Sequence, residues 1–398
     1  MTDPAFGRAI RPAFLLEADA AHLNHGSFGA TPRVVLAAQD DWRRRLEAQP
    51  SRFMMRELEP ALAQARGPLA RLLGADPAGL AFVDNATTGV NAVARSLDLA
   101  PGDEVLTTDH GYGAVRQTFT HVCARAGARL VEAALPFPPR SSAELEAAVV
   151  ERIGPRTRLV VIDHVTSPSA IILPVAAIAT AARARGVPVL VDGAHAPGML
   201  DLAIDELPVD WYTGNCHKWL CAPKGSAFLW AGTERRERLH PTVISHGYGR
   251  GFEAEFGWTG TRDPSPWLSV PAAIDFLDGF GAGGPGAVGL GVARVRAYTV
   301  DLARRAADLL AAAWGNEARV PAALHGTMAI VALPAALQRR LGPATEEHSR
   351  RLRHQIWDEH RVEIPIMAID GRHWARLSAF IYNEIDDYER LAAAGRAL

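Results

Sequence analysis

Between residues 60 and 230, short apolar runs rich in β-branched residues alternate with longer stretches rich in Ala, Leu and Arg. The short runs predict strands and the longer stretches predict helices. Such an alternation predicts an α/β fold, in which a parallel sheet is covered by helices on both faces. The predicted strands span residues 80–83, 104–107, 158–163, 187–191, 211–213 and 227–230, and the predicted helices span 59–73, 89–97, 112–126, 143–153 and 175–185.

A glycine-rich stretch at 279–291 follows this region and predicts a linker. Its glycines match part of a dinucleotide-binding fingerprint, but a helical stretch at 271–277 precedes them where a strand is required. Beyond it we expect a smaller α+β domain. The predicted order is a helix at 292–314, a strand at 328–333, a helix at 346–359 and strands at 362–365 and 376–381. We therefore expect an N-terminal segment at 1–20 that packs on the small domain, a large domain at 21–278 and a small domain at 279–398.

Charge and cysteine content exclude several classes of protein. The net charge is −2, which gives no support for nucleic-acid binding. Three cysteines are too few for a disulfide framework, and the first twenty residues contain no apolar run. The longest apolar stretch, at 170–182, is too short to span a bilayer. We expect a cytoplasmic protein that binds neither nucleic acid nor membrane, and no ligand spacing predicts a metal site.

Lysine is rare in this chain. Lys218 and Lys224 are the two lysines among 42 basic residues, and the other 40 are arginines. A genomic preference for arginine codons explains most of this bias. Arginine stays protonated in proteins, whereas lysine can lose its proton and act as a nucleophile. One of the two lysines is therefore a candidate reactive amine.

Three polar segments follow predicted strands, where ligands bind in open α/β sheets. In the segment 82–91 a helix begins at a turn in which Thr87 or Thr88 can cap it, and the exposed N–H groups can bind an anion. In the segment 189–198 a strand delivers Asp192, with His195 three residues later. In the segment 211–220 Lys218 lies among apolar residues, which favours its free amine.

Each segment also has a plain structural explanation: a helix cap, a turn aspartate and a surface lysine. Together, however, they supply an anion site, a carboxylate and a nucleophilic amine in that order. These are the groups that pyridoxal 5′-phosphate (PLP) requires for its phosphate, its pyridine nitrogen and its aldehyde. The ordered set therefore predicts a PLP site.

With these segments the sequence resembles the class V aminotransferases of PLP fold type I, and most closely their isopenicillin N epimerase-like branch. The resemblance extends from about residue 22 to about residue 391. It rests on the segments 23–29 (LNHGSFG), 85–88 (NATT), 109–114 (DHGYGA), 164–168 (HVTSP), 191–195 (VDGAH), 217–218 (HK), 258–263 (WTGTRD) and 376–383 (RLSAFIYN).

The resemblance implies a mainly parallel seven-stranded sheet, a smaller α+β C-terminal domain, and a homodimer with shared active sites. It implies that PLP forms a Schiff base with Lys218 and pairs its pyridine nitrogen with Asp192. The other implied cofactor contacts are Ala86, Thr87, Thr88, Asn215 and His217 for the phosphate, His195 and Ser167 for the ring hydroxyl, His110 or Tyr112 stacked on the ring, and Gly260 and Thr261 for the phosphate of the neighbouring subunit.

The resemblance further implies an amino-acid substrate, bound as an external aldimine and deprotonated at Cα. Arg376 would clamp the α-carboxylate, and Asn24 and His25 would border the substrate. Epimerisation needs a proton returned to the face opposite Lys218, from His110, Tyr112, His25 or a water.

Other outcomes of the same chemistry stay open. They are β-elimination from an S-substituted cysteine or its sulfoxide, and transamination. A cysteine desulfurase is disfavoured, because residues 361–376 lack the cysteine that such enzymes carry. A non-catalytic binding module is also disfavoured, because Lys218, Asp192 and Arg376 are all intact.

Overall fold

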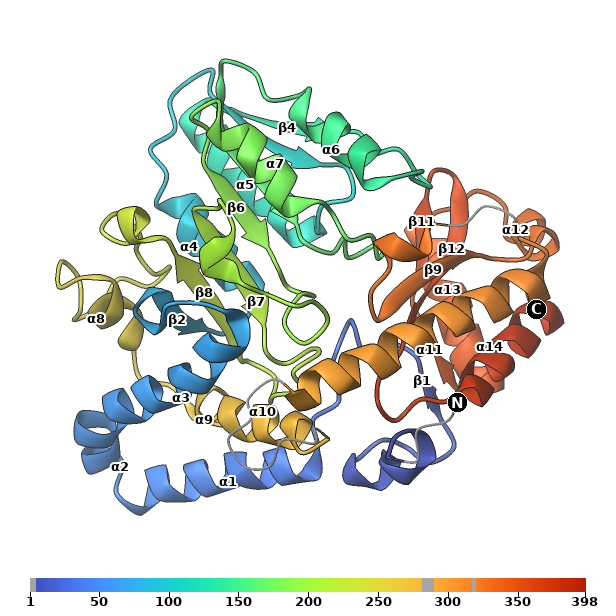
Figure 1. Cartoon of the computed structure of the whole chain (residues 1–398), viewed down its shortest axis with the longest axis horizontal. Helices are drawn as coiled ribbons and strands as arrows, with labels where there is room; N and C mark the ends of the chain where they lie inside the picture. Colours follow the sequence, from blue (N-terminus) through green and yellow to red (C-terminus); the bar gives the residue numbers. More distant parts are fainter. Residues whose placement is uncertain (1–4, 281–289, 317–319) are drawn as a thin grey trace.

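A seven-stranded sheet forms the centre of the larger part of the molecule (Figure 1). The computed structural model describes residues 5–280, 290–316 and 320–398. The strand order is β2 (Leu80–Val83), β8 (Ala227–Ala231), β7 (Trp211–Asn215), β6 (Val189–Asp192), β5 (Thr157–Asp163), β3 (Glu104–Thr108) and β4 (Arg129–Ala133). β8 runs antiparallel to β2 and β7, and the other neighbouring strands are parallel. The mainly parallel sheet is thus confirmed.

Helices cover both faces of this sheet, and alternate residues of β5 show the two layers. Val160 and Ile162 pack in a cluster with residues of α3 (Leu58–Leu73), α6 (Ser142–Val150), α7 (Val175–Arg183) and α10 (Val270–Asp278). Leu159 and Val161 pack in another cluster with residues of α4 (Ala86–Arg95) and α5 (Gly113–Ala126). Burial on both faces explains why the central strands read as continuous apolar runs.

The sequence did not predict β4, the strand at one edge of the sheet. Its first residue, Arg129, is exposed and ion-pairs with Glu104, and Glu132 pairs with Arg116. Edge strands commonly carry such charges, which discourage pairing with other chains. The charges also remove the apolar run by which a strand is recognised in a sequence.

A second, antiparallel sheet lies in the C-terminal part, in the order β11 (Ile366–Ile369), β12 (Arg372–Ser378) and β9 (Met328–Ala332). The helices of this part are α11 (Leu290–Trp314), α12 (Ala335–Leu341), α13 (Glu346–His360) and α14 (Ile385–Ala397). Two predicted strand boundaries were wrong. Arg376 lies inside β12, and residues 379–381 follow the strand. Of the predicted strand 362–365, only Val362–Glu363 form a strand, β10. It pairs with β1 (Ala21–His22) and not with the three-stranded C-terminal sheet.

Most of the predicted linker lies outside the described residues, at 281–289. In the part of the chain that the structure describes, no helix has the length and apolar character needed to cross a membrane.

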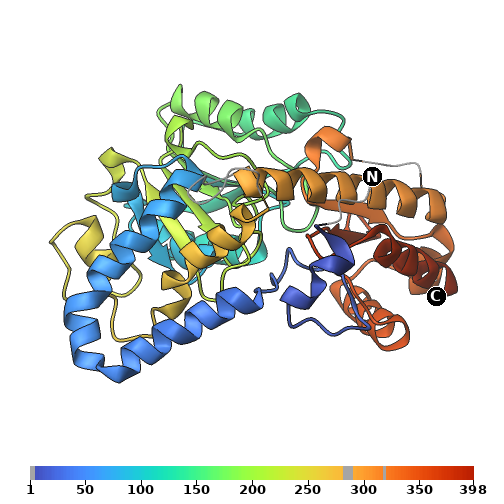
Figure 2. The same cartoon turned by 60° about the horizontal axis from the view of Figure 1, so that its bottom comes forward.

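The N-terminal segment lies beside the C-terminal elements (Figure 1). Arg8 pairs with Glu384 and Asp386 of the C-terminal region. The chain then passes through β1 into α1 (Arg33–Ala48), a long helix along the lower side of the larger part (Figure 2). The short elements α2 (Pro50–Arg52), α8 (Phe252–Gly257) and α9 (Ser265–Leu268) complete the fold around the sheet.

Phe14 fixes the N-terminal segment to both parts of the molecule. Its side chain is 2% exposed and its ring makes edge contacts with Phe276, Phe380 and Tyr382. We expect Phe14→Ala to lower the free energy of unfolding by about 3–5 kcal/mol, because a buried aromatic ring leaves a cavity. Leu15→Ala is the control: Leu15 is 63% exposed, and its loss should cost less than about 0.5 kcal/mol. Urea unfolding measures both, and equal effects would contradict the anchoring role.

Candidate active site

The carboxyl ends of three neighbouring parallel strands deliver the polar residues of the site. β5 ends at Asp163, β6 at Asp192 and β7 at Asn215. Asp192 is the register partner of Asp163 on one side and of Thr213 on the other. Because parallel strands end at the same edge of a sheet, segments far apart in the sequence meet there, as the sequence predicted.

Lys218 follows β7 and is partly buried. Its Nζ atom lies 3.2 Å from Nε2 of His195. Desolvation lowers the pKa of the Lys218 amine to about 8, the nearby Arg376 adds to this effect, and the carboxyls of Asp192 and Asp163 oppose it. The free amine is therefore accessible near neutral pH, as a nucleophilic lysine requires.

Asp192 and His195 are both buried, 3% and 2% exposed. Burial raises the pKa of the Asp192 carboxyl, whereas the Ala194 N–H, 3.0 Å away, and Lys218 favour its ionised form. Burial holds the pKa of His195 well below its usual range, so its ring is neutral. The Nδ1 atom of His195 finds no hydrogen-bond partner among the described residues. An unpartnered buried polar atom is costly, and it indicates that the site is shaped for a ligand.

Gly193 directly follows Asp192 at the end of β6. A Cβ atom at Gly193 would lie 2.1 Å from the ring of Tyr212. Tyr212 is fully buried, and its hydroxyl hydrogen-bonds to Nδ1 of His164 at 2.7 Å. Only glycine lets this ring pack against the backbone that follows Asp192, so Tyr212 supports the end of β6 from the other face of the sheet.

The N-terminus of α4 lies beside these groups. The sequence predicted Thr87 or Thr88 as its cap, and this was wrong: Asn85 is the cap. The Asn85 Oδ1 atom accepts the Thr88 N–H at 2.8 Å, and the Thr88 hydroxyl donates to the same atom. Asparagine at this position has the extended backbone that a cap requires. The Ala86 N–H donates to Oδ1 of Asn215 at 2.9 Å, which joins α4 to β7.

The His217 ring is held by a backbone carbonyl group of the following loop. Its Nδ1 donates to the Ser226 carbonyl at 2.8 Å, and burial lowers the pKa of the ring to about 4. The carbonyl can only accept, so the neutral ring carries its proton on Nδ1 and leaves Nε2 as an acceptor. A bound dianion would raise this pKa and make Nε2 a donor.

Arg376 reaches the same site from β12 of the C-terminal part. Its NH1 atom donates to the carbonyl of Ser167 at 2.6 Å, and its NH2 atom donates to the hydroxyl of Ser27 at 2.6 Å and to Oδ1 of Asn24 at 3.4 Å. Its side chain is buried, which lowers its pKa to about 10, so it remains charged at neutral pH. Its Nε atom has no partner in the part of the chain that is described.

Successive residues of β12 face opposite sides of the C-terminal sheet. Leu377 packs in the core of the C-terminal part, while Arg376 and Ser378 point to the other side and contact the segment after β1. Ser167, which the sequence placed near the cofactor, contacts Arg376.

Asn24 and His25 are adjacent in sequence, but their side chains contact different parts of the site. Asn24 contacts Arg376 and donates to Glu363 at 3.1 Å. His25 is fully buried, stacks on Phe380, and hydrogen-bonds to the Tyr382 hydroxyl and the Lys218 carbonyl. Asn24 therefore borders the same space as Arg376, whereas His25 supports the backbone of Lys218.

His110 and Tyr112 follow β3. The His110 ring is 5% exposed, and its Nδ1 lies 2.7 Å from the hydroxyl of Ser169, which in turn lies 2.7 Å from the hydroxyl of Thr166. Burial lowers the pKa of His110, so the ring is neutral near pH 7. Tyr112 is 44% exposed.

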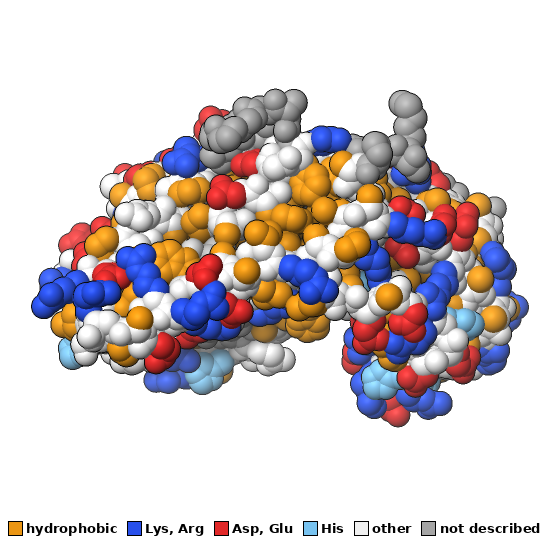
Figure 3. Space-filling view, turned by 90° about the horizontal axis from the view of Figure 1, so that it is seen from below, with side chains coloured by type: hydrophobic (Ala, Val, Ile, Leu, Met, Phe, Trp, Pro, Cys, Tyr) orange, Lys and Arg blue, Asp and Glu red, His pale blue; other side chains and the backbone are white. Residues whose placement is uncertain are grey.

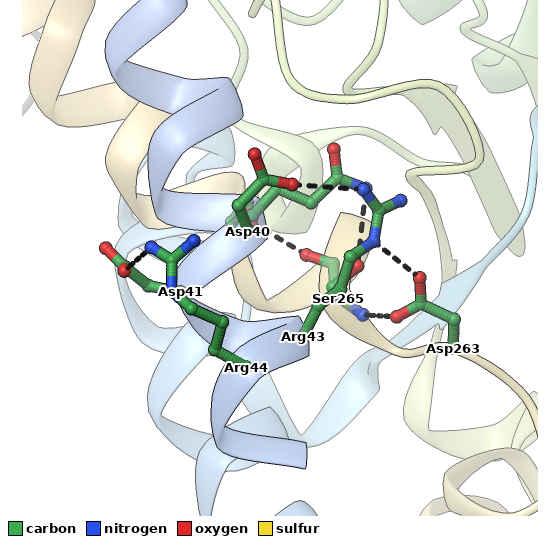
Figure 4. Close-up of polar contacts among 8 residues, drawn as sticks. Asp40, Asp41, Arg43, Arg44, Asp263 and Ser265 are labelled. Atoms are coloured by element: carbon green, nitrogen blue, oxygen red, sulfur yellow. Dashed lines mark hydrogen bonds and ion pairs between the residues drawn. The ribbon is translucent and has the colours of Figure 1, made fainter. Parts of the chain in front are cut away.

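Gly260 and Thr261 directly precede Arg262, which pairs with Asp84 just before the N-terminus of α4. Thr261 is exposed, and a Cβ atom at Gly260 would meet open space. The segment that follows them is fixed to α1 (Figure 4). There Arg43 donates to Asp263 at 3.0 Å, and Asp263 accepts the Ser265 N–H at 2.8 Å.

Sequence reasoning missed three contributors. Asp163 is buried beside Asp192, Tyr212 lies behind it, and Ser27 holds Arg376. The rule that singled out Asp192, a carboxylate at the end of an apolar strand, also applies to Asp163. No sequence signal marks Tyr212 or Ser27. Among the residues that the structure describes, no group of three His, Cys, Asp or Glu side chains could hold a metal ion.

Comparison with known proteins agrees with this geometry. The aminotransferase class-V family profile matches residues 27–283. The chain is 39% identical to isopenicillin N epimerase of Streptomyces clavuligerus, over 98% of this chain and 97% of that protein. It is 36% identical to a putative L-cysteine desulfhydrase of Oryza sativa subsp. japonica, over 95% of this chain and 83% of that protein. Its fold is similar to that of a C-DES mutant with glycine covalently linked to its PLP cofactor. The TM-score is 0.78, the sequence identity is 22%, and 99% of each chain is covered.

The mainly parallel sheet with its C-terminal α+β part is the fold of the fold-type I PLP-dependent enzymes, and Lys218 and the buried Asp192 lie at the carboxyl edge of that sheet. The chain belongs to the aminotransferase class-V family. The residues present fit its cofactor, PLP. The Lys218 amine is partly neutral near pH 7, and buried His195 presents an unpartnered polar atom beside it.

We expect the rate of covalent capture of PLP by the apoprotein to rise with pH through about 8. At pH 7 about one lysine in ten is unprotonated at that pKa, against about one in 3000 at the ordinary value of 10.5. Stopped-flow absorbance measures the rate. Lys224→Ala should leave the profile unchanged and Lys218→Ala should abolish capture, and a midpoint near 10 would contradict the desolvated site.

Proposed function

We propose that this enzyme removes and returns the Cα proton of an amino acid, as an epimerase related to isopenicillin N epimerase. The observation that carries this proposal is that the site holds two candidate proton-transfer groups: the Lys218 amine, whose pKa is lowered to about 8, and the neutral imidazole of His110, which contacts the Ser169 hydroxyl. Epimerisation needs such a group on each face of the reacting carbon. The 39% identity to isopenicillin N epimerase over nearly the whole chain supports this choice.

Bound PLP withdraws electrons from the Cα atom and thereby acidifies its C–H bond. Lys218 would hold the cofactor covalently and then take the Cα proton, which suits an amine whose pKa lies near the working pH. Asp192 would keep a proton on the pyridine nitrogen, because a buried carboxylate strongly favours a cationic partner. His195 would meet the ring hydroxyl.

We propose the N-terminal turn of α4 as the phosphate site. Its first residues, Ala86, Thr87 and Thr88, lie where the helix dipole favours an anion. Asn215 already contacts this turn, and a phosphate would turn His217 into a donor.

His110 is the group that we assign to the second face. Its Nδ1 contact with Ser169 orients the ring, and the Ser169 hydroxyl is held in turn by that of Thr166. His25, the other buried histidine considered, has both ring nitrogens engaged behind Lys218. Tyr112 would lie over the substrate carboxylate near Arg376.

A PLP-dependent C–S lyase is the second candidate, because the chain is also 36% identical to a putative L-cysteine desulfhydrase. β-Elimination needs Lys218 and a leaving group at Cβ, and no proton donor on the second face. Transamination is a third possibility on the same site.

We also propose a homodimer with shared sites. Beside Gly260 and Thr261 lies a groove of about 760 Å³, lined in part by Met54, Met55 and Trp258. Hydrophobic side chains also gather across the middle of the face seen from below (Figure 3). A partner at the groove would bring these two residues close to a neighbouring phosphate. We propose a cytoplasmic location, in keeping with three buried free cysteines.

We propose a division into a large PLP-binding domain and a small C-terminal domain near residue 279. A separate apolar cluster in the C-terminal part supports it. Because Ala21 and Leu23 belong to that cluster, we extend the N-terminal segment that packs on the small domain from residue 20 to Leu23.

The reaction is tested with purified holoenzyme on amino acids and S-substituted cysteines. We expect loss of optical rotation and uptake of deuterium at Cα, without pyruvate or ammonia. His110→Ala should slow epimerisation far more than deuterium uptake, because it removes only the second-face group. Release of pyruvate and ammonia at the rate of substrate loss would refute the epimerase and establish the lyase.

Arg376 should govern recognition of the substrate carboxylate. Loss of a bidentate, charge-assisted contact between the guanidinium and the substrate carboxylate costs about 2–4 kcal/mol. We therefore expect Arg376→Ala to lower kcat/KM about 30- to 1000-fold. Arg372→Ala, an exposed arginine on the same strand, is the matched control and should change it less than about threefold. Steady-state kinetics on the best substrate measures both. If a decarboxylated analogue reacted as well as the amino acid, the clamp would be wrong.

A further inference from the structure

A buried histidine and a buried tyrosine lie behind Lys218 and have no part in the chemistry proposed above. His25 follows β1 and is 0% exposed, and Tyr382 follows β12 and is 1% exposed. Nε2 of His25 lies 3.0 Å from the carbonyl oxygen of Lys218, and Nδ1 lies 2.8 Å from the Tyr382 hydroxyl. The two side chains therefore form a continuous hydrogen-bonded connection from the C-terminal part to the backbone of Lys218.

The direction of each hydrogen bond follows from the Lys218 carbonyl, which can only accept. Nε2 of His25 therefore carries the proton and donates it, which leaves Nδ1 of the neutral ring as an acceptor. The Tyr382 hydroxyl donates to this Nδ1, and the Ala30 N–H approaches the same atom at 3.4 Å. Both ring nitrogens are thus engaged, and neither is free to exchange a proton with a substrate.

Aromatic packing fixes the orientation of both side chains. The His25 ring stacks on Phe380, with ring centroids 3.7 Å apart and ring planes 16° apart. The Tyr382 ring makes an edge contact with Phe14, with centroids 5.0 Å apart. Because a close-packed interior leaves no room for these rings to turn, His25 keeps its N–H directed at the Lys218 carbonyl.

The backbone at Lys218 is also closely packed by the segment after β1. A Cβ atom at Gly29 would lie 2.5 Å from the His217 carbonyl oxygen and 2.7 Å from that of Lys218. The Lys218 carbonyl accepts the Cys221 N–H at 2.8 Å, so it receives one hydrogen bond from its own turn and a second from His25. Since a lysine side chain is a flexible four-carbon stem, the position of its amine depends on how firmly its backbone is held.

We propose that His25 and Tyr382 are positioning residues: the Tyr382 hydroxyl orients His25, whose Nε2–H holds the Lys218 carbonyl and so fixes the point from which the amine reaches cofactor and substrate. This inference rests on the proposed function, because it takes Lys218 as the reactive amine. It applies to epimerisation and to β-elimination alike, since both reactions use that amine.

The test compares Tyr382→Phe with Tyr388→Phe. Tyr388 is also fully buried, and its hydroxyl also makes one hydrogen bond at 2.8 Å, to the Ser378 carbonyl. Each variant loses one hydroxyl and keeps its ring, so both should lower the urea midpoint of unfolding by similar amounts. Tyr388→Phe therefore controls for the loss of stability alone.

We expect Tyr382→Phe to slow covalent capture of PLP by the apoprotein at pH 7 about 3- to 10-fold, the factor that one hydrogen bond contributes. In the holoenzyme kcat should fall by the same factor while KM is unchanged, because the contacts of Arg376 remain. The pH midpoint of capture should also be unchanged, because no charge is removed. Tyr388→Phe should leave the capture rate, kcat and KM at the parent values.

Two variants of His25 separate its contact with Lys218 from its contact with Tyr382. Glutamine places an amide N–H near the position of Nε2 and can still donate to the carbonyl, whereas the shorter asparagine reaches only as far as Nδ1. We expect His25→Gln to capture PLP within about threefold of the parent rate and His25→Asn to be slower by about tenfold or more.

Three results would overturn the proposal. The first is an equal effect of Tyr382→Phe and Tyr388→Phe on capture and kcat, and the second is a parent-like capture rate in His25→Asn. The third is a shifted pH midpoint in Tyr382→Phe, which would show that the pair acts on the charge of the amine and not on its position. Absence of a cofactor absorbance band in the parent protein would instead refute the proposed function.

Discussion

The burial of Lys218 and Asp192 at the carboxyl edge of the sheet is the constraint on which the rest of the site depends. Desolvation brings the pKa of Lys218 to about 8. It also raises the free energy of the ionised Asp192 carboxylate unless a cationic partner lies beside it. The apolar core beneath them provides this desolvation, and Gly193 allows Tyr212 to complete it. The site thus derives its reactivity from the packing of the sheet and not from the two residues alone.

The site is also a junction between parts of the chain that are distant in sequence. Arg376 comes from β12, yet its contacts are Ser167 after β5 and Asn24 and Ser27 after β1. These contacts require the C-terminal sheet, the N-terminal segment and the large sheet to meet. A substrate carboxylate at Arg376 would therefore be held at a fixed position relative to Lys218, which contributes orientation as well as affinity.

Much of the fold could be predicted because central strands buried on both faces leave continuous apolar runs. The prediction failed at β4, where charges at the edge conceal the strand, and it ended the strand at 362 two residues too late, because only Val362–Glu363 pair with the N-terminal segment. It also failed at the α4 cap, because asparagine and threonine are both acceptable caps and local geometry selected Asn85. These errors concern edges and ends, where short segments have few neighbours to constrain them.

By itself the sequence determined the α/β architecture and the family, and it predicted an anion site, a carboxylate and a lysine in that order. Strand-end positions carry this information because parallel strands bring their carboxyl ends to one edge. Only the tertiary structure decided that His25 lies behind Lys218, that Ser167 faces Arg376, and that a second carboxyl, Asp163, is buried beside Asp192. Those outcomes depend on which side chains face each other across elements, and spacing along the chain does not encode that.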